Sequence, residues 1–287
     1  MSLTSEQLRR REEAEQSFER VRALKKMSGA ELRRVLGGDP VEAAPWVRAA
    51  AEQGISFGQL RWGAMLMEGQ GVEQDPALAL HWFTQAARAG NGEAMNMVGR
   101  CFENGWGTAI ELQRAAHWYK RSAESGHDWG EYNYAHMLFD GTGIPEDRCE
   151  ALKWYRRAAG RGHARAMNLL ARCHEEGWGC EKNPAEAADW YRRSAEAGYF
   201  RAQFNHGCIL AEAGRSEEAA HWLRLAAEAD ETIRREIARR PLLAELTFKS
   251  VIPALALGHA HISEGPASGE GLQLIDAGFE GYWSRRP

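Results

Sequence analysis

Residues 94–126 read AMNMVGRCFENGWGTAIELQRAAHWYKRSAESG, and most of this pattern returns every 36 residues along the chain. Tryptophan marks the period at Trp46, Trp82, Trp118, Trp154 and Trp190, and Trp222 follows after 32 residues. A Gly-x-Gly keeps the same step at Gly69/Gly71, Gly105/Gly107, Gly141/Gly143 and Gly177/Gly179. A period of this length indicates stacked supersecondary units rather than a single globular core.

Each unit predicts two antiparallel helices. In residues 91–126 the first is expected over about 93–104, because Gly105 and Gly107 can take the left-handed conformation that ends helices. The second is expected over about 112–125 and ends at Gly126. One pair cannot bury its apolar face alone, so the units must stack. The predicted fold class is all-α: a right-handed α/α superhelix, or solenoid, of antiparallel helix pairs.

The period also divides the chain. Residues 1–54 are expected to form an N-terminal helical cap, with possible capping boxes at Thr4/Gln7 and Ser28/Glu31 and a helix around Trp46. Five repeat units follow at 55–90, 91–126, 127–162, 163–198 and 199–230, the last one shorter at its inter-helix loop. Residues 231–287 are expected to form a C-terminal cap and an irregular tail, with a helix over 231–246 broken at Pro241 and a glycine-rich remainder.

Composition narrows the classes of function. The 287 residues are 44% hydrophobic with a formal net charge of -4, which favours neither nucleic acid nor an anionic membrane as a partner. The charged start of the chain and the lack of a bilayer-length apolar run predict a cytoplasmic protein. Five irregularly spaced cysteines suit reduced thiols better than a disulfide framework.

The quoted stretch, together with YNYAHMLFDGTGIPEDRCEALKWYRRAAGRG at 132–162, resembles the unit of the Sel-one-like repeat (SLR) family, whose members are cousins of the tetratricopeptide repeat. The resemblance covers about residues 42–230. It implies an adaptor that gathers other proteins into complexes. A cysteine-rich, disulfide-stapled branch of that family pairs cysteines between neighbouring units. This chain departs from that branch, because the matching positions hold Met95 and Ala123, or Glu131 and Ala159.

The first helix of each unit carries the predicted binding surface. In tetratricopeptide-like stacks these helices line the concave side, and residues in an i, i+4, i+7 rhythm share one face. Such a ladder of amides, aromatics and cations suits an extended peptide, whose backbone could bond to the amides and whose carboxylates could pair with arginine. The predicted partner-binding residues are Asn96, Arg100, Trp129, Tyr132, His136, Arg165, Asn168, Arg172 and Arg201.

Two interpretations of the arginines remain open. Arg100 could instead pair with Glu103 or Asn104, and Arg172 with Glu175 or Glu176, as ordinary contacts within a helix. Trp129 favours binding, because an aromatic residue on an exposed groove is a common anchor. We therefore predict a non-catalytic adaptor or scaffold without a cofactor, whose partner is a protein or peptide that can carry acidic groups.

The stretch ARCHEEGWGC at 171–180 raises an enzymatic alternative, a hydrolase or thiol-dependent enzyme built around Cys173 and His174. Consecutive helical side chains fan apart, so these residues cannot converge on one metal ion. The matching stretch GRCFENGWGT at 99–108 indicates a helix end and its turn, with Cys173 as a core residue. Neither this stretch nor His259 with His261 is expected to bind metal.

A third alternative is a structural subunit whose residues 231–287 dock on another copy or fill the groove. The sequence leaves the oligomeric state open.

Overall fold

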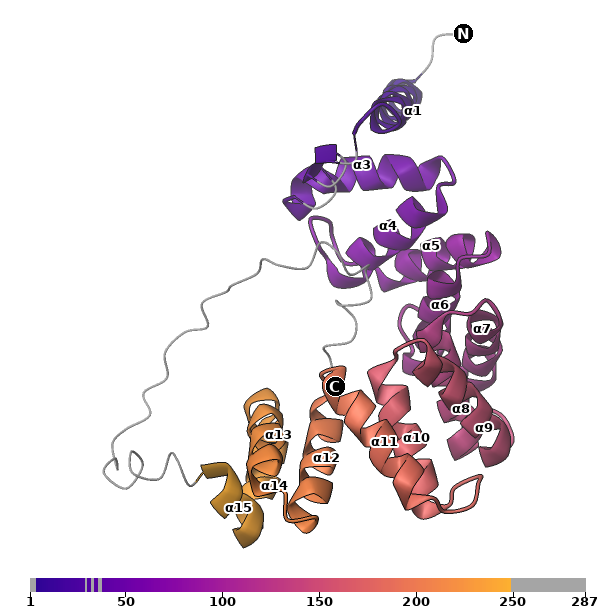
Figure 1. The fold of residues 1–287 in the computed structure, drawn as a ribbon. Coiled ribbons are helices and arrows are strands. Elements are labelled where there is room, and N and C mark those ends of the chain that lie inside the picture. The colour runs from indigo at the N-terminus through magenta and orange to yellow at the C-terminus, as the bar shows by residue number, and fades with distance from the viewer. Residues whose placement is uncertain (1–3, 29, 32–33, 36–37, 249–287) are drawn as a thin grey trace. The chain divides into compact units, whose positions relative to one another are not determined.

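The structure is a computed structural model that describes residues 4–28, 30–31, 34–35 and 38–248. Within these ranges every regular element is a helix (Figure 1). The described residues form two compact units, 4–89 and 90–248, and each is considered by itself. None of the described helices has the length and apolar character needed to cross a bilayer.

The first unit holds α1 (Ser5–Leu24), α3 (Pro40–Glu52), α4 (Ser56–Glu68) and α5 (Pro76–Arg88). The predicted capping box at the start of α1 is confirmed, because the side chains of Thr4 and Gln7 each accept a hydrogen bond from the other's backbone N–H. The same reciprocal bonds join Ser28 and Glu31. The predicted helix around Trp46 is α3, which packs against both α1 and α4.

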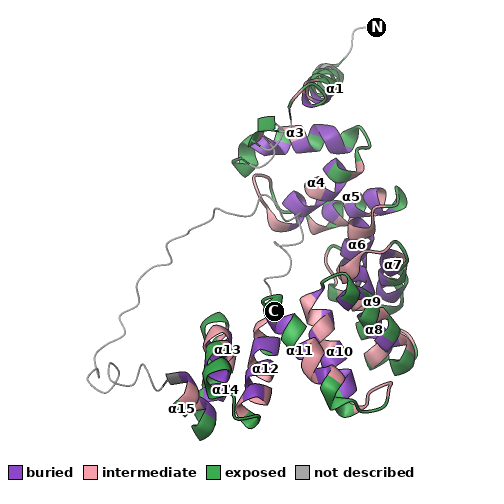
Figure 2. Ribbon diagram, in the orientation of Figure 1, coloured by how far each residue is buried: buried purple, intermediate pink, exposed green. Residues whose placement is uncertain are grey.

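The second unit contains four helix pairs followed by two short helices. The pairs are α6 (Gly92–Asn104) with α7 (Leu112–Glu124), α8 (Asp128–Asp140) with α9 (Arg148–Gly160), α10 (Ala164–Glu176) with α11 (Pro184–Glu196), and α12 (Phe200–Glu212) with α13 (Ser216–Ala229). Each pair packs against the next, and the buried faces turn toward neighbouring helices (Figure 2). The predicted arrangement of consecutive helix pairs is confirmed.

The glycine turn ends the first helices α4, α6, α8 and α10 as the sequence predicts, whereas α12 has Ala213 at its C-terminal cap. Gly105 has φ 72°, in the left-handed region, and its N–H donates to the carbonyl of Cys101. The chain then folds back, so that the N–H of Glu111 donates to the carbonyl of Phe102 at 2.8 Å. After α10 the same return places the N–H of Asn183 2.7 Å from the carbonyl of His174. The turn therefore brings residues beyond it back beside the end of the first helix.

Close packing explains the recurring small residues. A Cβ added at Gly99 would lie 2.6 Å from the ring of Tyr119, which is fully buried between α6 and α7. The ring therefore occupies the space that a larger residue on α6 would need.

The C-terminal cap closes the second unit. Its helices are α14 (Glu231–Arg239) and α15 (Pro241–Phe248), and the break between them falls at Pro241 as predicted. Ile237 and Leu243 pack with Leu223 of α13, so the two short helices cover its apolar face. The predicted tail beyond 248, with His259 and His261, lies outside the described residues.

Candidate functional site

The nine residues predicted to bind a partner lie on the first helices α6, α8, α10 and α12 of the second unit. They differ in exposure. Arg172, His136 and Arg201 are exposed, whereas Arg100, Trp129, Tyr132 and Arg165 are half-buried, and Asn96 and Asn168 are buried.

The two asparagines join neighbouring first helices. Asn133 of α8 donates from Nδ2 to Oδ1 of Asn96 at 2.8 Å, and Asn205 of α12 donates to Oδ1 of Asn168 at 3.1 Å. Their side chains are only 6% and 5% exposed. The structure thus corrects the expectation that these two amides face solvent. A buried amide needs a partner, and an asparagine on the next first helix supplies it.

Arg100 and Arg172 each lie over the tryptophan of the turn that follows their helix. The guanidinium carbon is 4.9 Å from the ring centre of Trp106 for Arg100 and 5.0 Å from that of Trp178 for Arg172. The nearby carboxylates are engaged by tyrosines: Tyr119 donates to Glu103 at 2.5 Å and Tyr191 to Glu175 at 2.7 Å.

His136 and Arg201 each contact a neighbour on their own helix. His136 is exposed, and its Nδ1 lies 3.3 Å from the carboxylate of Asp140 one turn along α8. The guanidinium carbon of Arg201 lies 5.7 Å from the ring centre of Phe200.

Three aromatic rings from α8 and the start of α10 pack together. Trp129 lies 5.9 Å from Tyr132 between ring centres, and His163 lies 4.5 Å from Trp129 and 4.8 Å from Tyr132, stacked on the latter at 22°. His163 also caps α10, because its Nδ1 accepts from the N–H of Ala166 at 3.1 Å. Burial lowers the pKa of His163 to about 4, so the ring is neutral at pH 7.

Arg165 brings positive charge onto this aromatic cluster. Its guanidinium carbon is 5.4 Å from the ring centre of Trp129 and 6.0 Å from that of Tyr199. Burial raises the pKa of Tyr132, and the charges of Arg165 and Arg201 act against that increase. Burial also lowers the pKa of Arg100, to which repulsion from Arg165 contributes. Arginines from α6, α10 and α12 therefore act electrostatically on one another or on Tyr132 of α8.

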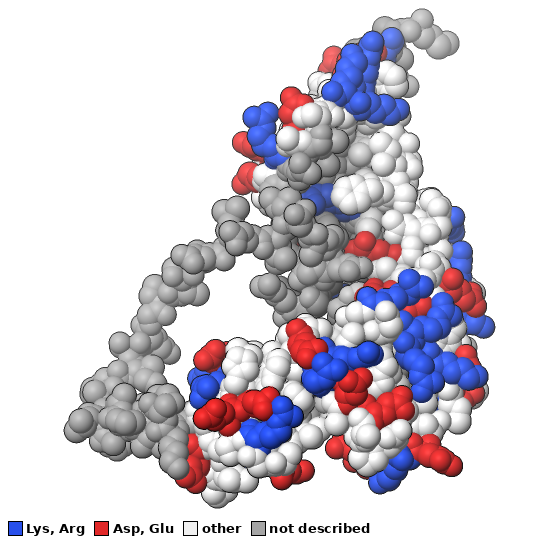
Figure 3. Space-filling model, viewed as in Figure 1, with Lys and Arg blue, Asp and Glu red and all other residues white. Residues whose placement is uncertain are grey.

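We call Trp129, Tyr132, Arg165, Tyr199 and Arg201 the aromatic-arginine surface. Tyr199 was not predicted, although it directly precedes α12 and occupies the position that His163 holds before α10. This 36-residue correspondence is the signal that could have found it. On the face seen in Figure 3, acidic and basic side chains are interspersed over the described residues.

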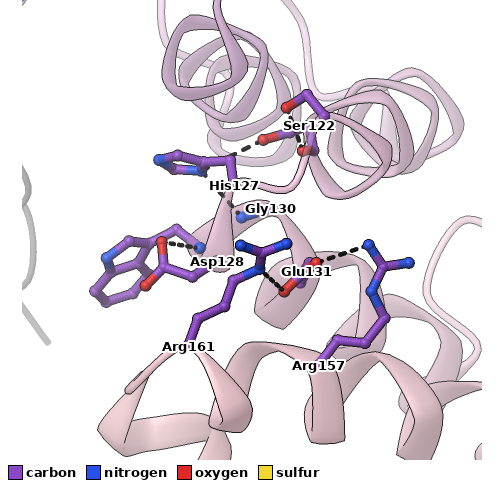
Figure 4. A network of polar contacts seen from close by, with 9 residues as sticks. Ser122, His127, Asp128, Gly130, Glu131, Arg157 and Arg161 are labelled. Atoms are coloured by element: carbon purple, nitrogen blue, oxygen red, sulfur yellow. Dashed lines mark hydrogen bonds and ion pairs between the residues drawn. The ribbon is translucent and has the colours of Figure 1, made fainter.

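A buried carboxylate lies next to Tyr132 in the chain. Glu131 is 0% exposed, and its oxygens lie 3.0 Å from a guanidinium nitrogen of Arg157 and 3.3 Å from one of Arg161 (Figure 4). Both arginines come from α9 and its end and are half exposed. Neither contact has the alignment of a hydrogen bond, so we describe them as ion pairs. The sequence did not predict this buried ion pair.

Cys173 is a core residue, as the repeat predicts. It is 2% exposed, and burial raises the pKa of its thiol to about 12. A buried thiol of that pKa is a poor nucleophile, which counts against an enzyme built around Cys173 and His174. In the described part of the chain no group of three or more histidine, cysteine or acidic side chains could hold a metal ion.

The fold and this surface define an α-helical repeat protein made of stacked helix pairs. The Sel1 repeat family matches at residues 56–91, 92–127, 130–163, 164–199 and 201–231. The chain belongs to the Sel1 repeat family, and the resemblance found in its sequence is confirmed.

Solved structures agree with this assignment. A Sel1 repeat protein from Oxalobacter formigenes is 26% identical with a TM-score of 0.68, over 77% of this chain and 96% of that one. A protective antigen of uropathogenic Escherichia coli strains, described as displaying an SLR fold, is 30% identical with a TM-score of 0.61 over 69% of this chain. The match spans 44% of the antigen's own length. A comparison with curated proteins found no match.

Proposed function

We propose that this chain is a non-catalytic adaptor that binds a protein or peptide carrying acidic groups, and that the aromatic-arginine surface is its binding site. The observation that carries the proposal is the meeting of Trp129, Arg165 and Tyr199, which come from three consecutive helix pairs. Tryptophan, tyrosine and arginine are the residue types most enriched at the energetic centres of protein interfaces.

The charge of the surface gives the chemistry of the partner. Arg165 and Arg201 both act on Tyr132, and a carboxylate from a partner would relieve the repulsion between neighbouring guanidinium groups. Arg172, exposed over Trp178, extends the positive charge along α10. Planar guanidinium groups bind carboxylates through two parallel hydrogen bonds, so an acidic segment is the expected ligand.

The buried asparagines have a different role in this proposal. Asn96 and Asn168 are buried, and their hydrogen bonds fix the register of neighbouring first helices. Rigid support of this kind lowers the entropy that a binding surface loses when it meets its partner. The adaptor is expected to act in the cytoplasm, a reducing compartment that suits its free thiols.

A comparative pull-down from native lysate tests the proposal. The bait is the full chain, and its variant is Arg165→Glu with Arg201→Glu. The matched control is Arg192→Glu with Arg193→Glu, which makes the same change of charge on the second helix α11, where both arginines are exposed. Proteins captured by the wild type and the control but lost by the variant support the proposal. An identical set of captured proteins for all three chains contradicts it.

A further inference from the structure

Cys180, His174 and Glu186 form a thiol, imidazole and carboxylate series at the turn between α10 and α11. Sγ of Cys180 lies 3.6 Å from Nδ1 of His174, and Nε2 of His174 lies 3.2 Å from a carboxylate oxygen of Glu186. His174 is 4% exposed, whereas Cys180 and Glu186 are half-buried. The contact with Glu186 lacks the alignment of a hydrogen bond, so the carboxylate acts on the ring through its charge. A negative charge beside Nε2 favours the tautomer with its proton there, which leaves Nδ1 as an acceptor facing the thiol.

The equivalent positions two units earlier show that this series is not a general feature of the repeat. Phe102, Thr108 and Arg114 stand there, and the guanidinium carbon of Arg114 lies 3.9 Å from the centre of the Phe102 ring. The fold brings the His174 and Glu186 positions together in both units, because Phe102 and Arg114 also make contact. Only the later unit fills all three with groups that can exchange a proton.

A second thiol lies beside the same turn. Gly179 packs onto the first turn of α9, where an added Cβ would be 2.5 Å from the carbonyl oxygen of Arg148 and 3.2 Å from the backbone nitrogen of Cys149. Cys180 follows Gly179 directly, and Cys149 is close enough to contribute to the raised pKa of the Cys180 thiol. Cys149 is exposed, and both thiols are free.

We propose that Cys180 and Cys149 form a disulfide when the protein meets a hydroperoxide, with His174 as the base that takes the proton of Cys180. Nδ1 of His174 accepts the thiol proton, and the Cys180 sulfur attacks one peroxide oxygen. The S–O bond forms as the O–O bond breaks, and the departing oxygen takes the proton from His174. Cys180 is then a sulfenic acid.

Cys149 completes the reaction. Its sulfur attacks the sulfur of Cys180, the S–S bond forms as the S–O bond breaks, and the hydroxide that leaves takes the Cys149 proton to become water. In total two thiols lose two electrons and the hydroperoxide gains them. A thiol reductant reverses the modification by exchange.

The groups around Cys180 explain why it needs a base. Burial raises the pKa of its thiol, the charge of Arg156 on α9 lowers it, and Glu186 and Cys149 raise it. The thiol also lies 3.5 Å from the carbonyl oxygen of Cys173, which competes for its proton. Transfer to His174 therefore supplies the thiolate that its surroundings alone disfavour.

Mass spectrometry of the full chain tests this proposal. The protein is treated with a small excess of hydrogen peroxide, its remaining thiols are alkylated, and it is digested without reduction. We expect one crosslinked peptide pair joining Cys149 to Cys180, lighter by two hydrogens, while Cys101 and Cys173 stay reduced in the core. The crosslink should disappear after treatment with dithiothreitol.

Variants separate the role of the base from mere proximity of the two thiols. His174→Gln and Glu186→Gln should each slow the oxidation of Cys180 by about tenfold or more, because general-base catalysis has been removed. Arg114→Gln, at the position equivalent to Glu186, is the matched control and should leave the rate unchanged. If His174→Gln fails to fold, the half-buried Glu186→Gln decides.

Three results would overturn the proposal. One is the separate oxidation of Cys149 and Cys180 without a crosslink between them. The second is that peroxide oxidises Cys149 while Cys180 stays reduced. The third is a rate of Cys180 oxidation that stays the same in Glu186→Gln and in any folded His174→Gln variant. Partner binding is not required for any of these outcomes.

Discussion

The guanidinium carbon of Arg165 lies 5.4 Å from the centre of the Trp129 ring, so a cation from one helix pair rests on an aromatic residue from the preceding pair. Cation-π contacts of this kind contribute about 0.5–1 kcal/mol where they are exposed to water. The contact holds both side chains in place at the centre of the proposed binding surface. An acidic partner would then meet a surface that is already organised.

Trp129→Ala should weaken partner binding by about 2 kcal/mol or more, because an aromatic anchor at the centre of an interface contributes at least that much. Isothermal titration calorimetry with a partner identified by pull-down would measure the change. Trp190→Ala, which removes a half-buried tryptophan from the second helix α11, is the control. An equal loss of affinity in both variants would point to altered folding rather than a lost contact.

Removing the arginines that pair with Glu131 should lower the free energy of unfolding more than removing the charge of Glu131 itself. Arg157→Gln with Arg161→Gln leaves the carboxylate buried and unpaired, and we expect a loss of about 3 kcal/mol or more. Glu131→Gln leaves two half-exposed arginines that water can solvate, so its loss should be smaller. Urea unfolding at pH 7 measures both. A larger loss for Glu131→Gln would contradict this view of the pair.

The two hydrogen bonds between asparagine side chains should contribute similarly to the free energy of unfolding. Asn133→Ala leaves Oδ1 of Asn96 buried without its donor, which costs about 1–3 kcal/mol of stability, and Asn205→Ala should do the same to Asn168. Asn104→Ala is the control, because its amide is exposed and bonds only to the backbone of its own helix. A change no greater than that of the control would mean that these amides do not hold neighbouring helices together.

Acid should destabilise the protein through His163. Burial lowers the pKa of His163 to about 4 in the folded state, whereas in the unfolded chain its pKa is near 6.5. Between these two pH values the unfolded chain binds a proton that the folded chain does not. Stability is therefore present above pH 6.5 and falls as the pH drops toward 4, by at most about 3 kcal/mol.

His163→Asn tests this pH dependence with a residue the chain already uses, because Asn91 caps α6 at the equivalent position. The loss of unfolding free energy between pH 7 and pH 4.5 should be smaller in this variant than in the wild type. Burial also lowers the pKa of His127, so some pH dependence will remain. Equal pH dependence in the two proteins would rule out His163 as a source.

The sequence predicted the helix pairs because the determinants of helix ends are local. Gly105 and Gly177 end their helices in the left-handed conformation, and this does not depend on where the neighbouring helix pairs lie. The burial of a side chain, in contrast, depends on the helices packed around it. Asn96, Tyr132 and Asn168 occupy the same repeat position, yet the asparagines are buried and Tyr132 is half exposed. Asn133 and Asn205 make the difference, and they stand in every second unit only.

The contact between His174 and Cys180 was also beyond a reading of helical periodicity. Helical periodicity separates His174 from its neighbour Cys173, since adjacent side chains on a helix diverge. Cys180 approaches His174 only because the turn folds back along the end of α10. Arg114 lies over Phe102 in the earlier unit, so the repeat also brings the equivalent of Glu186 onto the equivalent of His174.

The most direct test of the proposed adaptor function is the affinity of one captured acidic partner for three purified chains: the wild type, Arg165→Glu with Arg201→Glu, and Arg192→Glu with Arg193→Glu. Circular dichroism and the melting temperature first establish that all three are folded. The account predicts that the first variant loses about 100-fold or more in affinity, since two charge-assisted contacts of about 1.5–3 kcal/mol each become repulsive. The second should stay within about threefold of the wild type, as expected of exposed charges outside the interface. Equal affinity of all three chains would contradict the binding surface on α8, α10 and α12.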